Sequence, residues 1–198
     1  MRKLLLGFTF ATVLSIVLAP LANADSIRYG YRLDNSSNTD GFYQNAFMID
    51  YMHQTKIENF RVGVGFRRIE RDRDNRLTNR YQLKFQNRNI MGVDGLHLGY
   101  QIGTKERSKK EMTEYGQVQL QYGRRFNDGA SKIGWKTAYV YREGIFSGDK
   151  STDYYHGPRF QLTYRHSWLW RSSIQFDHQN RTDGETRNRI AYRIQRNF

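Results

Sequence analysis

Over most of residues 169–179 and 186–198, apolar side chains alternate with polar ones, many of them basic or amide. Ile190, Tyr192 and Ile194 share one parity, whereas Arg189 and Arg193 share the other. Successive side chains of a β-strand point to opposite faces, so such strands have one apolar face and one cationic face. The pattern predicts β-structure whose two faces meet different environments.

The N-terminal segment indicates where those environments are. Arg2 and Lys3 precede an apolar run over residues 4–18, and the A-x-A site at residues 22–24 follows it, which is typical of a secretory signal peptide. We expect residues 1–24 to be the signal peptide and residues 25–198 to be one exported domain. No later apolar run reaches the roughly 18 residues of a membrane-spanning helix. An exported sheet with an apolar face therefore predicts a β-barrel in the bacterial outer membrane.

Ten segments of period two can be counted along the chain. They cover residues 26–33, 43–53, 60–69, 77–87, 96–105, 113–125, 133–142, 153–166, 169–179 and 186–198. The expected fold is all-β, an antiparallel transmembrane β-barrel of ten strands. An even number of strands brings both chain ends to the periplasmic side, so polar segments such as residues 34–42 and 143–152 would be external loops. Pro158 cannot donate to a strand ladder and predicts a bulge or a strand end.

The inward parity of these strands is strongly cationic. Only Asp50 and Asp177 are expected in the wall beside sixteen cations. Thirteen of the cations are the candidate substrate-binding residues that line the pore: Arg28, Arg32, Arg61, Arg67, Arg80, Lys84, Lys136, Arg159, Arg165, Arg171, Arg187, Arg189 and Arg193. The other three are Lys105, Arg125 and Arg142. Two wall carboxylates cannot neutralise sixteen cations, so the inward residues predict an open, anion-selective lumen. Arg80, Arg159, Arg171, Arg189 and Arg193 have no acidic neighbour in sequence and are expected to set the selectivity.

The neutral inward residues narrow the type of anion. Arginine forks can grip carboxylates with two hydrogen bonds, and inward glutamines such as Gln117, Gln161 and Gln175 suit hydroxyl groups. Tyr115 and Tyr155 offer stacking surfaces. This combination favours an acidic sugar chain that passes without a nucleotide, cofactor or catalytic step. The net charge of +13 alone would also suit nucleic acid, but export excludes that partner, and the five histidines lack the spacing of a metal site.

At this point the chain resembles the oligogalacturonate-specific porin family. The resemblance rests on residues 26–32 (SIRYGYR), on residues 157–160 (GPRF), on inward arginine rows and on small size. It implies a monomeric outer-membrane channel for passive uptake of acidic oligosaccharides such as oligogalacturonate. Members of the family resemble twelve-stranded barrels, whereas ten segments are counted here.

The sequence also leaves three alternative functions open and suggests two partners. If loop acids neutralised the lumen, the chain would be a closed scaffold or a small-anion barrel. An omptin-like protease would have to use Asp72, Asp74, Asp177 and His178, and a lipid acyl hydrolase would need Ser172 and His178 on the lipid face. Terminal Phe198 is similar to the signal that engages the barrel assembly machinery. The loop at 105–110 could contact lipopolysaccharide phosphates.

Overall fold

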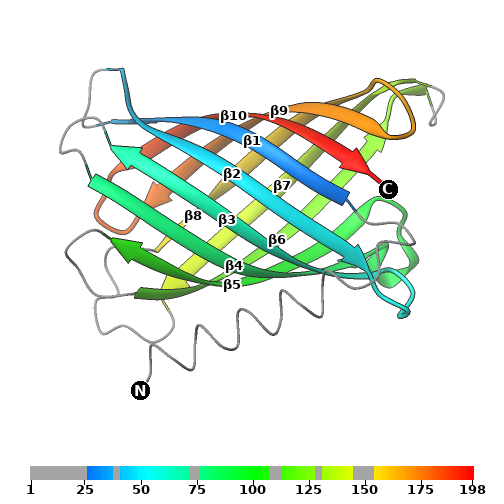
Figure 1. The fold of residues 1–198 in the computed structure, drawn as a ribbon, viewed down its shortest axis with the longest axis horizontal. Coiled ribbons are helices and arrows are strands. Elements are labelled where there is room, and N and C mark those ends of the chain that lie inside the picture. The colour runs from blue at the N-terminus through cyan, green and yellow to red at the C-terminus, as the bar shows by residue number, and fades with distance from the viewer. Residues whose placement is uncertain (1–25, 38–40, 72–75, 108–112, 128–130, 145–153) are drawn as a thin grey trace.

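The computed structural model describes residues 26–37, 41–71, 76–107, 113–127, 131–144 and 154–198. Ten strands follow one another along the chain (Figure 1): β1 (Ser26–Ser36), β2 (Phe42–Gln54), β3 (Phe60–Arg71), β4 (Arg76–Arg88), β5 (Leu96–Arg107), β6 (Thr113–Arg125), β7 (Ile133–Gly144), β8 (Tyr155–Arg165), β9 (Trp170–Arg181) and β10 (Thr186–Asn197). A single turn of 3-10 helix, η1 (Ile90–Gly92), lies between β4 and β5. The expected signal peptide over residues 1–24 lies outside the described residues.

The strands form one closed antiparallel barrel. Each strand pairs with its neighbour in sequence, and β1 pairs with β10 to close the ring. The predicted count of ten strands is confirmed, and the twelve implied by the family resemblance are not present. The start of β1 and the end of β10 lie at the same end of the barrel (Figure 1), which is the periplasmic side in bacterial barrels of this class. We call the opposite end external.

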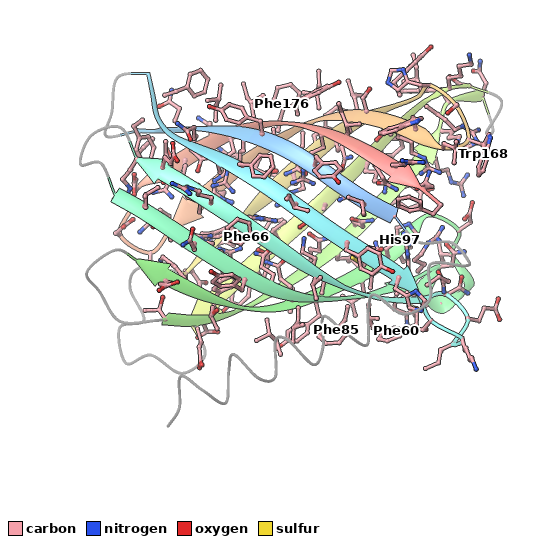
Figure 2. All side chains as sticks on the ribbon, in the orientation of Figure 1. Phe60, Phe66, Phe85, His97, Trp168 and Phe176 are labelled. Carbon is pink, nitrogen blue, oxygen red and sulfur yellow. The ribbon has the colours of Figure 1, made fainter. Side chains whose placement is uncertain are left out.

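Burial in this barrel is the reverse of that in a water-soluble protein. In β10, Tyr192 is 50% exposed, whereas the neighbouring Arg193 is only 7% exposed. Phe66, Phe85 and Phe176 likewise stand on the outer surface (Figure 2). Charged side chains are rarely buried in soluble proteins, but they line the interior of transmembrane barrels, whose apolar side chains face lipid. The chain is therefore a bacterial outer-membrane β-barrel, as the alternation predicted.

No helix in the described ranges is long and apolar enough to span a membrane.

Strand β1 is longer than the alternation indicated. The segment from Asp34 was expected to be an external loop, but β1 continues to Ser36, and Asp34 points into the barrel with no exposed surface. The expectation failed because two of the partners of Asp34 lie on other strands: Gln44 lies in β2 and Arg189 in β10. A register shift in the β1–β2 ladder accompanies this extension.

Pro158 interrupts one ladder without a bulge. On the β7 side, Gly157 and Pro158 keep their pairing with Val140 and Tyr139. On the β9 side neither residue pairs, yet the register is the same before and after them and β8 continues to Arg165, so the expected bulge or strand end is wrong. At Gly157 the two strands approach so closely that a Cβ atom would lie 2.0 Å from the His178 carbonyl oxygen.

The assigned faces give a direct prediction in a chain that has no cysteine. Gln161 lines the lumen and its neighbour Leu162 is on the outer face. A Gln161→Cys variant in lipid vesicles should react rapidly with a small water-soluble thiol reagent, whereas Leu162→Cys should react slowly because its thiol faces hydrocarbon. Mass spectrometry of the labelled protein measures both rates. Equal rates would contradict the assignment.

Candidate functional site

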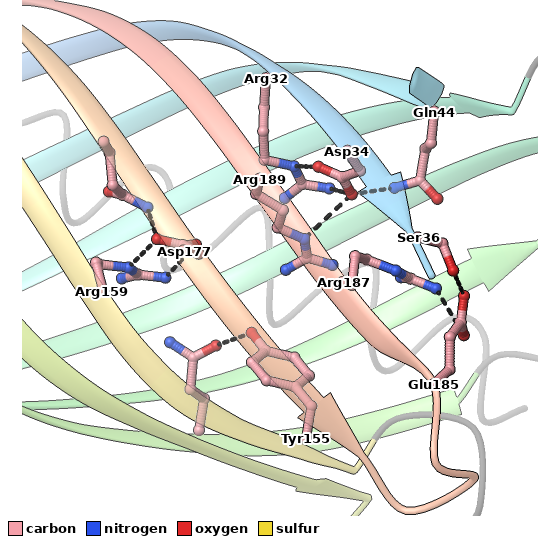
Figure 3. A network of polar contacts seen from close by, with 12 residues as sticks. Arg32, Asp34, Ser36, Gln44, Tyr155, Arg159, Asp177, Glu185, Arg187 and Arg189 are labelled. Atoms are coloured by element: carbon pink, nitrogen blue, oxygen red, sulfur yellow. Dashed lines mark hydrogen bonds and ion pairs between the residues drawn. The ribbon is translucent and has the colours of Figure 1, made fainter. Parts of the chain in front are cut away.

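A buried carboxylate organises the external half of the lumen. Asp34 accepts hydrogen bonds from Arg32 at 2.6 and 3.0 Å, from Arg189 at 3.1 Å and from Gln44 at 2.7 Å (Figure 3). At the rim above it, Glu185 accepts from Ser36 and from Arg187. Asp34 is thus a third wall carboxylate, in addition to Asp50 and Asp177, and it neutralises cations that were expected to be free.

A stacked arginine continues this packing across the lumen. Arg142 lies over the ring of Tyr115 at 4.1 Å and the ring of Tyr155 at 4.9 Å, measured from its guanidinium carbon to each ring centroid. Arg142 also donates to Gln117 Oε1 at 2.7 and 3.2 Å, and Arg189 lies over Tyr155 from the other side of the network at 5.5 Å. The two tyrosines that were expected to stack against sugar are therefore occupied by arginines.

Together these groups form what we call the external layer. Every strand contributes to it an inward side chain that is at most 6% exposed: Asp34, Gln44, Ile69, Gln82, Lys105, Tyr115, Arg142, Tyr155, Gln179 and Arg189. A water-filled channel would leave such side chains accessible to solvent. The external half of the lumen is closed by side chains in this conformation.

A second carboxylate, Asp177, joins the layer to the middle of the barrel. Arg159 donates to it at 2.8 and 3.1 Å, and Gln175 donates at 2.6 Å (Figure 3). Arg159 also donates to Gln119 at 2.9 Å. Arg159 and Arg189 were chosen as selectivity residues because no acid is near them in sequence, but in the barrel each has a carboxylate partner.

The periplasmic half of the lumen, by contrast, is hollow. Two cavities of about 580 and 440 Å³ lie there and share lining residues that include Arg28, Lys136, Gln161, Arg171 and Gln195. The larger cavity is lined by eight arginine and lysine side chains and by one carboxylate, that of Asp94. We call the two spaces together the periplasmic cavity. Its size falls in the usual range of small-molecule sites.

Like charges surround two cations of the periplasmic cavity, Lys136 and Arg171. The charged groups that act most strongly on Lys136 are Arg28, Arg171, Arg88 and Arg61, all of which are positive. Those that act on Arg171 are Arg125, Arg165, Arg88 and Arg28, again all positive. In the wall of this half, the carboxylate of Asp50 is in an ion pair with Lys84. A dissolved anion would relieve this mutual repulsion.

The thirteen candidate residues therefore divide into two groups. Nine line the periplasmic cavity: Arg28, Arg61, Arg67, Lys84, Lys136, Arg159, Arg165, Arg171 and Arg193. Arg32, Arg80, Arg187 and Arg189 are instead buried in the external half. Sequence analysis missed Arg88, Arg124 and Lys132, which also line the cavity. Continued alternation beyond residue 87 would have found Arg88, which lies at the end of β4.

The residues of the enzyme and metal alternatives are not assembled in the described part of the chain. Asp177 faces the lumen, whereas His178 faces outward and hydrogen-bonds Asn188 at 2.8 Å; Asp72 and Asp74 lie outside the described residues. The Ser172 Oγ atom lies 2.9 Å from His166 Nε2, so its histidine neighbour is not His178. The described residues contain no group of three or more potential metal ligands.

The structure describes residues at both of the expected partner contacts, the loop toward lipopolysaccharide and the terminal Phe198. Lys105 was expected both as an inward cation and at the start of a loop that reaches lipopolysaccharide. It is buried in the lumen, as the inward parity predicted, because β5 continues to Arg107; residues 108–110 lie outside the described part. At the periplasmic rim, Arg196 lies over the rings of Trp170 and Phe198 on the outer face.

Comparison with known proteins supports the architecture. The translocator domain of autotransporter NalP from Neisseria meningitidis is similar over 100% of this chain and 96% of its own, with 10% sequence identity and a TM-score of 0.54. The chain is an outer-membrane β-barrel. Two further structures have lower TM-scores. A KdgM porin has a TM-score of 0.46 and 14% identity over 89% of this chain and 99% of its own. An outer membrane channel from Pseudomonas putida F1 has a TM-score of 0.45 and 10% identity over 90% of this chain and 97% of its own. No family model and no curated protein match the sequence.

Proposed function

We propose that this barrel is a passive outer-membrane channel for anionic solutes, with short acidic oligosaccharides such as oligogalacturonate as the natural class. The observation that carries the proposal is the charge of the periplasmic cavity, where eight cationic side chains face one carboxylate in the larger space. Rows of arginine and lysine select anions at close quarters. The amides of Gln161 and Gln195, which also line the cavity, can exchange hydrogen bonds with sugar hydroxyls.

Passage through the barrel requires the external layer to rearrange. Its contacts are ion pairs, hydrogen bonds and arginine–tyrosine stacks between side chains, so they can change partners while the strand ladders stay intact. We infer that the conformation described here is the closed state of the channel, and that the monomer is the conducting unit. Terminal Phe198, at the periplasmic rim, is the proposed contact for the assembly machinery.

Selectivity provides the test. In a planar bilayer with a salt gradient, the protein should give a reversal potential of anion-selective sign, and Arg171→Gln with Arg193→Gln should move it toward zero. Both side chains line the periplasmic cavity, so their loss removes attraction for anions. Arg68→Gln is the matched control because Arg68 is exposed and paired with Glu70. A reversal potential that stays the same in the double variant would refute the assignment.

The external layer favours a second candidate function, that of a closed scaffold or a small-anion barrel. The size of the solutes that enter distinguishes it from an oligosaccharide channel. Liposomes that contain the protein should swell faster in trigalacturonate than in a neutral trisaccharide of similar size. Equal rates, or entry of neither sugar, would contradict the oligosaccharide channel. Chloride current without trisaccharide entry would then identify a small-anion barrel, and the absence of current a closed scaffold.

A further inference from the structure

The two halves of the lumen differ in a way that conduction alone does not explain. The external half is closed by paired side chains, whereas the periplasmic half holds a cavity lined by cations that repel one another. A uniform anion pathway would distribute its charge along the whole lumen. Here the cationic side chains that line an open cavity are at one end, behind a closed layer.

Among the described residues, buried donor atoms without a hydrogen-bond partner occur in both halves of the lumen, and several of them belong to side chains that line the cavity. Arg193 is only 7% exposed, and its buried Nε has no hydrogen-bond partner among the described residues. The buried Nε of Arg171 likewise has none there. Both side chains line the cavity beside Arg28 and Lys136. Buried polar groups are normally paired, and an unpaired one is costly, so these donors point to an acceptor supplied from solution.

The chemistry of the cavity defines that acceptor. One carboxylate or chloride could neutralise only one of the four cations Arg28, Lys136, Arg171 and Arg193, which lie on β1, β7, β9 and β10. A ligand with several oxyanion groups could accept from several of these strands at once. Charge-assisted hydrogen bonds of this type are roughly twice as strong as neutral ones, and the volume of the cavity suits a small organic or inorganic polyanion.

We propose that the periplasmic cavity is a one-ended binding site for small polyvalent oxyanions, filled from the periplasmic side and held by Arg28, Lys136, Arg171 and Arg193. Acetate and chloride have the same charge sign but only one charge each, so they should bind much more weakly. This inference goes beyond the proposed function, because the cavity can be occupied whether or not the barrel conducts.

Calorimetry on the full barrel in a zwitterionic detergent tests the site. Tripolyphosphate and citrate should bind with a stoichiometry near one, and acetate at the same ionic strength should give no measurable heat. Lys136→Gln combined with Arg171→Gln should weaken tripolyphosphate binding at least about tenfold, equivalent to about 1.4 kcal/mol. Arg68→Gln, which removes an outer-face charge outside the cavity, should leave the affinity unchanged. Equal affinity in all variants would overturn the proposal.

The side from which tripolyphosphate acts separates the one-ended binding site from the proposed channel function. If oriented barrels conduct, tripolyphosphate should block the current when added at the periplasmic end and not when added at the external end; equal block from both ends would refute a one-ended site. If no barrel conducts but calorimetry shows binding that depends on Lys136 and Arg171, the channel is refuted and the site stands. If the barrel is anion-selective but binds neither citrate nor tripolyphosphate, the site is refuted and the channel stands.

Discussion

Replacing Asp34 with asparagine should destabilise the barrel by about 3–5 kcal/mol, the usual cost of removing one partner from a buried ion pair. The change leaves the guanidinium groups of Arg32 and Arg189 buried without the carboxylate that both contact. Equilibrium unfolding by urea in phospholipid vesicles measures the difference. The matched control is Asp183→Asn, because the Asp183 side chain is 44% exposed and pairs with Arg181 at the surface; exposed pairs contribute about 0–1 kcal/mol.

A second substitution shows whether the loss comes from uncompensated charge. In the Asp34→Asn background, Arg189→Gln removes one of the two cations that have lost the carboxylate. It should recover part of the stability, although Arg189→Gln alone is destabilising. A double-mutant cycle of this kind isolates the coupling between residues in one network. Additive losses would show that Asp34 and Arg189 act independently, which would contradict the network described here.

Replacing Arg142 with alanine should open the external layer and raise single-channel conductance several-fold. Arg142 is 1% exposed and fills the space between Tyr115 and Tyr155, so its removal leaves a polar gap that water can enter. Conductance in planar bilayers is the measurement. Arg196→Ala removes a similar arginine–aromatic contact from the outer face and should leave conductance unchanged. Equal conductance in all three proteins would show that the external layer does not limit passage.

Sequence alone predicted the features of the barrel that depend on local alternation. Side chains two residues apart share a face, so the lipid-facing and lumen-facing sets could be assigned from parity, as the exposures of Tyr192 and Arg193 show. The number of strands followed from counting segments. The end of β1 could not be obtained in this way, because Asp34 resembles a loop residue until Arg189, 155 positions away, supplies its partner.

The state of the lumen was the harder prediction. Parity identified sixteen inward cations but not which of them pair, because pairing depends on register across neighbouring strands. Arg159 meets Asp177 only because β8 and β9 align those two positions. Stacking of Arg142 between Tyr115 and Tyr155 depends on side-chain reach inside the closed ring. The division into a closed external layer and a hollow periplasmic cavity therefore needed three-dimensional structure.

The pairing of β1 with β10 has a consequence for how the barrel assembles. The two strands match over eleven residue pairs, from Ser26 with Asn197 to Ser36 with Arg187, and they are separated by nearly the whole chain. Contacts between residues so distant in sequence form slowly, because the intervening chain must first be ordered. Until β10 arrives, the Asp34 carboxylate lacks the contact with Arg189, and the open edges of β1 and β10 carry unpaired backbone groups. Ring closure and formation of the Asp34–Arg189 ion pair are therefore coupled, so a half-closed sheet lacks both the last strand ladder and this ion pair.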